Sequence, residues 1–147
     1  LFLLGGAPGI AELAAKRLVE RYPNLKVVGT EHGYFDKSIS AVENYEVIQK
    51  VKKKKPNILI VGFGMPLQEK WLIENRRQIE ANVIMTGGAV FDYVSGRSRR
   101  APRWMTNNGM EWLGRLIFEP SRLWQRYIVG NPLFLWRIFK QKLFQSN

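Results

Sequence analysis

Glycine-rich segments follow two apolar runs of this 147-residue chain. Residues 5–9 read GGAPG and residues 62–66 read GFGMP. Glycine allows a phosphate to reach backbone N–H groups at the start of a helix, because no side chain blocks the approach. Tight turns between a strand and a helix would look the same. Neither segment is a Walker loop or a complete G-x-G-x-x-G fingerprint.

Three polar residues stand near such exits. Gln68 and Glu69 would occupy the first turn of a helix, where polar side chains point back toward the end of the preceding strand. Asp92 follows the segment GGAVF at 87–91 and is a candidate for a second pocket wall. Glu69 could instead only complement the helix dipole, and Asp92 could cap a short helix. The chain contains no Asp-x-Asp, a common metal-chelating motif of nucleotide-sugar transferases, so we expect no metal cofactor.

Arginines recur at helical spacing near the C-terminus, at positions 115, 122 and 126. Arg122 and Arg126 are one turn apart and share a helix face. Arginine forks suit phosphate or diphosphate groups, and tryptophan and tyrosine beside basic residues suit a membrane interface. Two alternatives stay open: a small helical subdomain with an aromatic core, and a binding surface for single-stranded nucleic acid.

Composition removes several classes of protein. Cysteine is absent and His32 is the only histidine, which excludes disulfides, thiolate zinc sites and cysteine nucleophiles, and disfavours histidine metal clusters and a Ser-His-Asp triad. The charge is uneven. Residues 1–96 carry 13 basic and 10 acidic side chains, whereas residues 97–147 carry 10 and 2, together with four of the five tryptophans. The second part therefore favours an anionic partner.

The elements that must position these residues alternate between strands and helices. We expect strands at 1–4, 25–29, 58–61 and 83–85, with helices at 8–21, 40–55 and 66–80 between them. Ser40 and Glu43 have the spacing of a capping box for the second helix. This order predicts an α/β fold, a Rossmann-like open parallel sheet over residues 1–96. A basic linker at 97–104 and helices at 109–118, 121–129 and 132–144 form a basic helical C-terminal appendage over residues 97–147.

Several segments also resemble the WecG/TagA/CpsF glycosyltransferases, glycosyltransferase family 26. GFGMPLQEKW at 62–71 resembles the family signature G-x-G-x-P-x-Q-E-x-W/F, and GGAVFDYVSG at 87–96 resembles its G-G-x-F-D-x-x-x-G segment. The family's C-terminal pattern R-A-P, E-W-L-x-R-L, E-P-x-R-L and R-Y is matched between residues 100 and 127. LLGG at 3–6 and HGYF at 32–35 match as well.

The resemblance implies transfer of an N-acetylmannosamine-type sugar from a UDP donor to a polyprenyl-diphosphate-linked N-acetylglucosamine. It implies a role in wall teichoic acid or related polysaccharide synthesis, at the cytoplasmic face of the bacterial membrane, with peripheral attachment to anionic lipid. Nucleic acid is not expected as a partner under this interpretation, and homo-oligomer formation stays open. A non-catalytic nucleotide- or nucleic-acid-binding module is the alternative.

The matched motifs also imply roles for individual residues. The UDP-sugar would be surrounded by Gly64, Pro66, Gln68, Glu69, Gly88 and Asp92. The acceptor diphosphate or the membrane would be bound by Arg115, Arg122 and Arg126. The family's general base is expected upstream of Leu1, so the catalytic base is not identified in this chain. Residues 1–147 are then expected to be an N-terminally truncated piece without turnover of their own.

Overall fold

The first part of the chain folds around a parallel sheet. The computed structural model describes residues 1–98, 102–118 and 120–144, and the chain divides into two compact units, Leu1–Ser98 and Arg99–Asn147. In the first unit the strand order is β2-β1-β3-β4, and all neighbours are parallel. The strands are β1 (Phe2–Gly5), β2 (Gly29–Glu31), β3 (Ile58–Gly62) and β4 (Val83–Thr86). The expected open parallel α/β sheet is confirmed.

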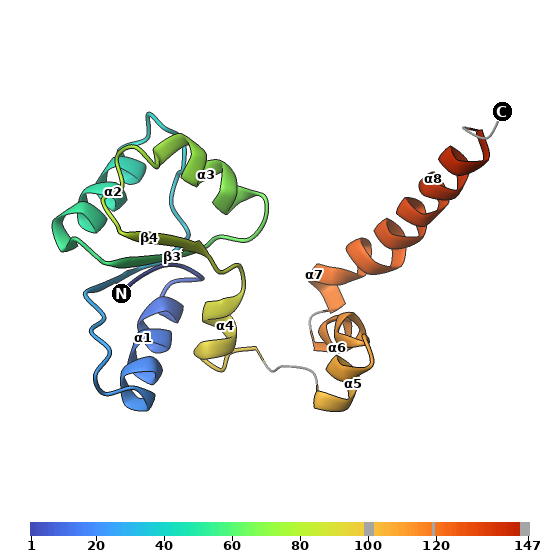
Figure 1. Cartoon of the computed structure of the whole chain (residues 1–147), viewed down its shortest axis with the longest axis horizontal. Coiled ribbons are helices and arrows are strands. Elements are labelled where there is room, and N and C mark those ends of the chain that lie inside the picture. The colour runs from blue at the N-terminus through green and yellow to red at the C-terminus, as the bar shows by residue number, and fades with distance from the viewer. Residues whose placement is uncertain (99–101, 119, 145–147) are drawn as a thin grey trace. The chain divides into compact units, whose positions relative to one another are not determined.

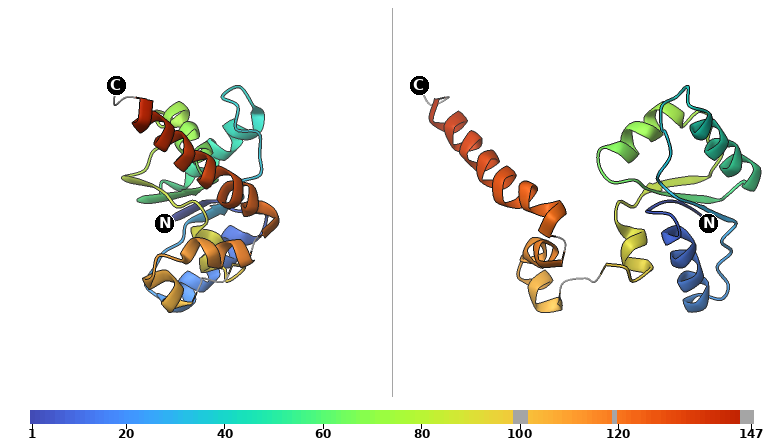
Figure 2. Two further views of the ribbon diagram at one scale, coloured as in Figure 1. Left: turned by 90° about the vertical axis from the view of Figure 1, so that its right-hand side faces the viewer. Right: turned by 180° about the vertical axis from the view of Figure 1, so that it is seen from behind.

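Helices cover both faces of this sheet (Figures 1 and 2). They are α1 (Ile10–Arg21), α2 (Val42–Lys54), α3 (Leu67–Asn75) and α4 (Val90–Val94). Successive strand side chains point to opposite faces. Phe2 and Leu4 therefore join the core beneath α2 and α3, while Leu3 packs with Phe91 of α4 and with α1. Coverage on both sides explains why the strands read as unbroken apolar runs.

Strand β2 begins later than the expected span of 25–29, which is a correction. It starts at Gly29, opposite Phe2 of β1, and ends at Glu31. Residues 25–28 run beside the start of β1 without forming a strand: the Val28 N–H donates to the Leu1 carbonyl and the Leu1 amino group to the Lys26 carbonyl, both at 2.8 Å. Gly29 is suited to this place because a Cβ there would lie 2.5 Å from the Phe2 ring. The shift puts Glu31 in the strand rather than in the loop.

The start of α2 and the end of α3 also differ from expectation. Ala41, not Ser40, is the N-cap of α2, and no side chain caps this helix. Glu43 instead accepts a hydrogen bond at Oε2 from the Asp36 N–H, 2.6 Å away. Helix α3 ends at Asn75 rather than near residue 80, because the chain tightens into turns there: the Gln78 N–H donates to the Asn75 carbonyl and the Ile79 N–H to the Arg76 carbonyl.

The second unit is helical. Its elements are α5 (Arg103–Asn107), α6 (Glu111–Phe118), α7 (Pro120–Trp124), the π-helix η1 (Gln125–Gly130) and α8 (Asn131–Phe144). The segment expected as a basic linker at 97–104 thus includes the start of α5, and residues 99–101 within it lie outside the described ranges. No helix in the described part of the chain is both long and apolar enough to span a membrane.

Candidate functional site at the carboxyl ends of the strands

The four strand exits meet at one edge of the sheet. The register places Gly5 opposite Gly62 and Val61 opposite Thr86. The chain runs outward from β1 to β2 and then returns past β1 to β3, so the strand order reverses between β1 and β3. Ligands of open α/β sheets bind outside the carboxyl ends at such a reversal point. The loops after β1 and β3 are therefore the candidate site.

Close backbone packing builds the floor of this site. A Cβ on Gly5 would lie 2.3 Å from the Gly62 carbonyl oxygen, so only glycine allows β1 and β3 to leave the sheet this close together. The Gly6 N–H donates to the Gly62 carbonyl at 3.1 Å, and the Gly33 N–H donates to the Gly6 carbonyl at 2.8 Å. These bonds join the exits of β1, β2 and β3.

Gln68 is buried and joins two further loops. Its Oε1 accepts from the Gly64 N–H at 3.2 Å and from the Gly88 N–H at 3.1 Å. Its amide Nε2 donates to Glu69 Oε1 at 2.7 Å. The N–H of Gly64, in one of the two glycine segments expected to bind phosphate, is thus already bonded within the protein, as is the N–H of Gly88.

Glu69 carries the unsatisfied group of the site. Its Oε1 is held by Gln68, but its Oε2 is buried and has no hydrogen-bond partner among the described residues. A buried acceptor without a partner is costly, and a ligand hydroxyl or amide would satisfy it.

The other residues expected around the donor lie beside Gln68 and Glu69 or on α4. Pro66 is the N-cap of α3. Gly64 and Gly88 both have positive φ, and a Cβ on either would meet nothing within 4 Å, so both loops border open space. Asp92 lies in the first turn of α4, half-buried. Its carbonyl accepts from Ser95 and Ser98, while its carboxylate has no partner in the part of the chain described.

Three aromatic side chains pack together where the loops after β2 and β3 meet helix α3. Phe35, Phe63 and Trp71 meet edge to face, with ring centroids 5.4 to 6.4 Å apart. The Trp71 indole N–H donates to Asn44 Oδ1 at 2.6 Å, and Asn44 Nδ2 donates to Asn75 Oδ1 at 3.0 Å. The sequence interpretation missed both asparagines, because nothing in their spacing distinguishes a buried amide on a helix from a solvated one.

The sequence interpretation also missed Lys37, which lies between the expected strand at 25–29 and the expected helix at 40–55. Burial lowers the pKa of the Lys37 ammonium, and the charges of Asp36 and Glu43 oppose this effect. Nζ lies 4.3 Å from the Phe35 ring centroid and 4.7 Å from that of Phe63. The ammonium therefore occupies a cation–π site between two rings, and Phe63 reaches it from a loop 26 residues away in the sequence.

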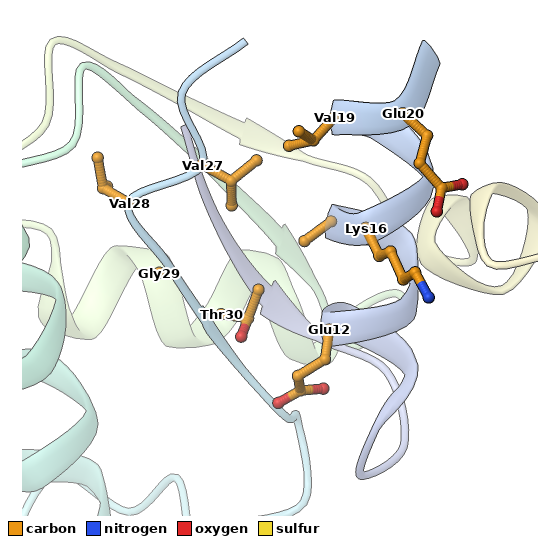
Figure 3. Close-up of a pocket in the computed structure, with 9 residues that line it drawn as sticks. Glu12, Lys16, Val19, Glu20, Val27, Val28, Gly29 and Thr30 are labelled. Atoms are coloured by element: carbon orange, nitrogen blue, oxygen red, sulfur yellow. The ribbon is translucent and has the colours of Figure 1, made fainter. Parts of the chain in front are cut away.

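A separate groove of ≈ 500 Å³ lies between α1 and the edge strand β2 (Figure 3). None of the residues expected around the donor lines it. Its walls are formed by residues that include Glu12, Lys16, Val19, Val27, Val28 and Thr30. Because it lies along the side of the sheet rather than at the strand exits, we do not assign the donor to it.

In the second unit, Arg115 belongs to α6, Arg122 to α7 and Arg126 to η1, and their side chains lie outside what the structure describes. The tryptophans are exposed rather than forming a core: Trp104, Trp112, Trp124 and Trp136. Exposure continues along α8, which bears Leu133, Phe134, Leu135, Trp136, Ile138 and Phe139.

Metal ligands do not gather in the described ranges: no group of three or more histidine, cysteine, aspartate or glutamate side chains is placed to hold an ion. A cation does lie in the loop after β2: the Lys37 ammonium donates to the carbonyls of Gly33 and Phe35.

Known proteins resemble this chain over nearly all of its length. An N-acetylglucosaminyldiphosphoundecaprenol N-acetyl-beta-D-mannosaminyltransferase of Staphylococcus aureus strain NCTC 8325 is 32% identical over 142 residues, which is 97% of this chain and 53% of the relative. The proteins of the same name from strains COL and MRSA252 are 32% and 31% identical, with the same coverage. The chain thus spans about half the length of the curated relatives it matches. None of these similarities supports the nucleic-acid-binding alternative.

The family comparison covers every residue. Residues 1–147 match the family described as "Glycosyl transferase WecG/TagA/CpsF family". The motifs at 62–71 and 87–96, which first suggested this resemblance, are the ones that build the strand exits around Gln68 and Gly88. The chain belongs to the WecG/TagA/CpsF glycosyl transferase family.

Proposed function

We propose that the protein transfers N-acetylmannosamine from a UDP donor to a polyprenyl-diphosphate-linked N-acetylglucosamine, as part of wall teichoic acid or related surface polysaccharide synthesis. The observation that carries this proposal is the 32% identity, over 97% of the chain, to transferases whose name states this acceptor and this sugar. The glycine-lined strand exits support it, because the reversal point of the sheet is where nucleotides bind in this class of fold.

Within this proposal the donor sugar lies against Glu69. The unpartnered Oε2 accepts a hydrogen bond from a sugar hydroxyl or from the acetamido N–H. Gln68 then acts as a positioning residue, since it holds Glu69 from one side and the Gly64 and Gly88 loops from the other. Gly64, Pro66, Gly88 and Asp92 form the surrounding wall.

The second unit binds the membrane and the acceptor in this proposal. Arg115, Arg122 and Arg126 bind the acceptor diphosphate through guanidinium forks. The exposed apolar side chains of α8 enter the interface of an anionic leaflet, and the attachment is peripheral, on the cytoplasmic face. Developing negative charge on departing UDP would be stabilised by fixed cations and N–H dipoles.

The experiment is a transfer assay on the full-length protein, with UDP-N-acetylmannosamine and a polyprenyl-diphosphate-N-acetylglucosamine acceptor in vesicles. Glu69→Gln should lose most of the turnover, and Glu74→Gln, an exposed carboxylate on the same helix, should retain it. Arg115, Arg122 and Arg126 replaced together by Lys should keep vesicle binding and lose transfer, because charge remains but the fork is lost. Absence of transfer by the unmodified protein would refute the proposal.

A further inference from the structure

We infer that Lys37 is a donor-binding residue whose ammonium contacts the diphosphate of the nucleotide sugar. This inference rests on the proposed function, because it assumes a nucleoside diphosphate at the strand exits. The glycine loops do not provide that contact through Gly64 or Gly88, since Gln68 already accepts from both N–H groups. A diphosphate therefore needs another cationic or N–H donor at this edge.

The ammonium of Lys37 is held but not saturated. Its Nζ donates to the Gly33 carbonyl at 2.5 Å and to the Phe35 carbonyl at 3.1 Å. An ammonium has three N–H donors. The third has no hydrogen-bond acceptor in the described part of the chain, where the Phe35 and Phe63 rings face the ammonium with centroids 4.3 and 4.7 Å from Nζ. A phosphate oxygen would give this N–H the acceptor that the rings do not provide.

The position of Lys37 coincides with the reversal point of the sheet. Its partner Gly33 donates to the Gly6 carbonyl at the exit of β1, and Phe63 follows β3 directly. Nζ therefore lies between the loop that follows β2, which hydrogen-bonds to Gly6 at the end of β1, and the loop that follows β3. Ligands of open α/β sheets bind at such a reversal point, outside the carboxyl ends of the strands.

Charge balance also favours an anionic ligand. No carboxylate of the described residues lies within ion-pair distance of the Lys37 Nζ, although Asp36 and Glu43 act on it from farther away. The side chain is half-buried, so an anion placed there would be screened less than at an open surface. A diphosphate would supply the negative charge that the protein itself does not place in contact with Nζ.

Packing fixes the ammonium before a ligand arrives. The rings of Phe35 and Phe63 are 5.6 Å apart and both contact Trp71 edge to face. Next to Lys37, the Asp36 carboxylate accepts from the N–H and the hydroxyl of Ser38, at 2.9 and 2.7 Å. A cation ordered in this way loses little further entropy when it binds an anion.

A purely structural role would make a different prediction. If Lys37 only clamped its loop by binding two carbonyls, its loss would disturb every ligand of the site to a similar degree. If it contacts the diphosphate, its loss would weaken UDP and leave uridine, which has no phosphate, unaffected.

The test compares UDP with uridine by calorimetry and ligand-observed NMR, on the full-length protein. Lys37→Met should weaken UDP by about tenfold or more and leave uridine unchanged, as expected for the loss of one charged hydrogen bond. Lys37→Gln should do the same while keeping an amide donor for the Gly33 and Phe35 carbonyls, which provides a variant should the methionine protein fail to fold. Lys53→Met, an exposed lysine at the end of α2, is the matched control and should bind both ligands normally.

The outcomes separate the two proposals. If the unmodified protein binds UDP and both Lys37 variants bind it equally well, the inference about Lys37 is overturned and the proposed function stands. Equal weakening of UDP and uridine would also overturn it, in favour of the clamp. If the unmodified protein does not bind UDP, the proposed function itself fails.

Discussion

The side-chain oxygen of Gln68 accepts a hydrogen bond from the backbone N–H of Gly88, 3.1 Å away and 20 residues later in the chain. The same oxygen accepts from Gly64, so one buried amide connects the loop after β3 to the loop after β4. The motif residues of two separate segments are thereby joined into one structural unit at the carboxyl ends of the strands.

Gln68→Ala should therefore reduce stability as well as UDP-sugar use. It leaves two part-buried N–H groups without their acceptor, and the loss of an acceptor costs about 1–3 kcal/mol where the donor is shielded from water. We expect a fall of that order in the free energy of unfolding, measured by urea denaturation. Gln78→Ala, an exposed glutamine beyond α3, is the control and should unfold like the parent. A Gln68→Ala protein of unchanged stability would contradict the role of this hydrogen bond.

Asn44→Ala should lower the free energy of unfolding of the first unit, because the Asn44 side chain is buried although α2 lies on the outside of the sheet. The substitution removes the acceptor of the Trp71 indole N–H and the donor to Asn75, both buried. We expect a loss of about 1–3 kcal/mol in the free energy of unfolding. Asn57→Ala breaks an exposed hydrogen bond to Asn82 and should change the stability little. Equal effects of the two substitutions would refute the network.

Acid should destabilise the loop that carries Lys37. Hydrogen bonds from the Ser38 N–H and hydroxyl hold the pKa of Asp36 below its usual 3.8, while burial acts in the opposite direction and Lys37 adds a smaller lowering effect. The resulting stability is present above pH 3.8 and is lost as the pH falls through the lower folded-state pKa. Ser38→Ala removes one of the two donors, so its stability relative to the parent should recover as the pH falls below 3.8. Chemical denaturation at pH 5 and at pH 3 measures this difference, and a constant difference would contradict it.

Trp136→Ser combined with Phe139→Ser should weaken binding to anionic vesicles. Both side chains are exposed on α8, and burying an apolar side chain of this size is worth about 1.5–3 kcal/mol. The two substitutions should reduce the vesicle binding that persists at high salt, because that component is apolar rather than Coulombic. Sedimentation with vesicles at low and high salt measures it. Ile73→Ser, which alters an exposed apolar residue of the first unit, should bind vesicles like the parent.

Local sequence determined much of the first unit. Alternation of apolar runs with helical periodicity predicted the parallel sheet, because strands covered on both faces must be apolar throughout. The glycines that end and follow β1 and β3 could likewise be found from residue type, because a residue without a side chain permits tight turns and leaves backbone N–H groups open. Residue type alone restricts the backbone at such positions, and no knowledge of distant partners is needed.

Tertiary structure alone decided how the site residues are used. The first-turn position of Gln68 predicted a polar side chain at the strand exits, but not that its oxygen would accept from Gly88, because that partner depends on how β3 and β4 align. The capping box at Ser40 failed for the same reason: Glu43 binds the Asp36 N–H instead. Lys37 gives no local signal, since its environment comes from Gly33, Phe35 and Phe63 on two different loops. Hydrogen bonds and cation–π contacts between segments far apart in the chain exist only after the sheet has set their register.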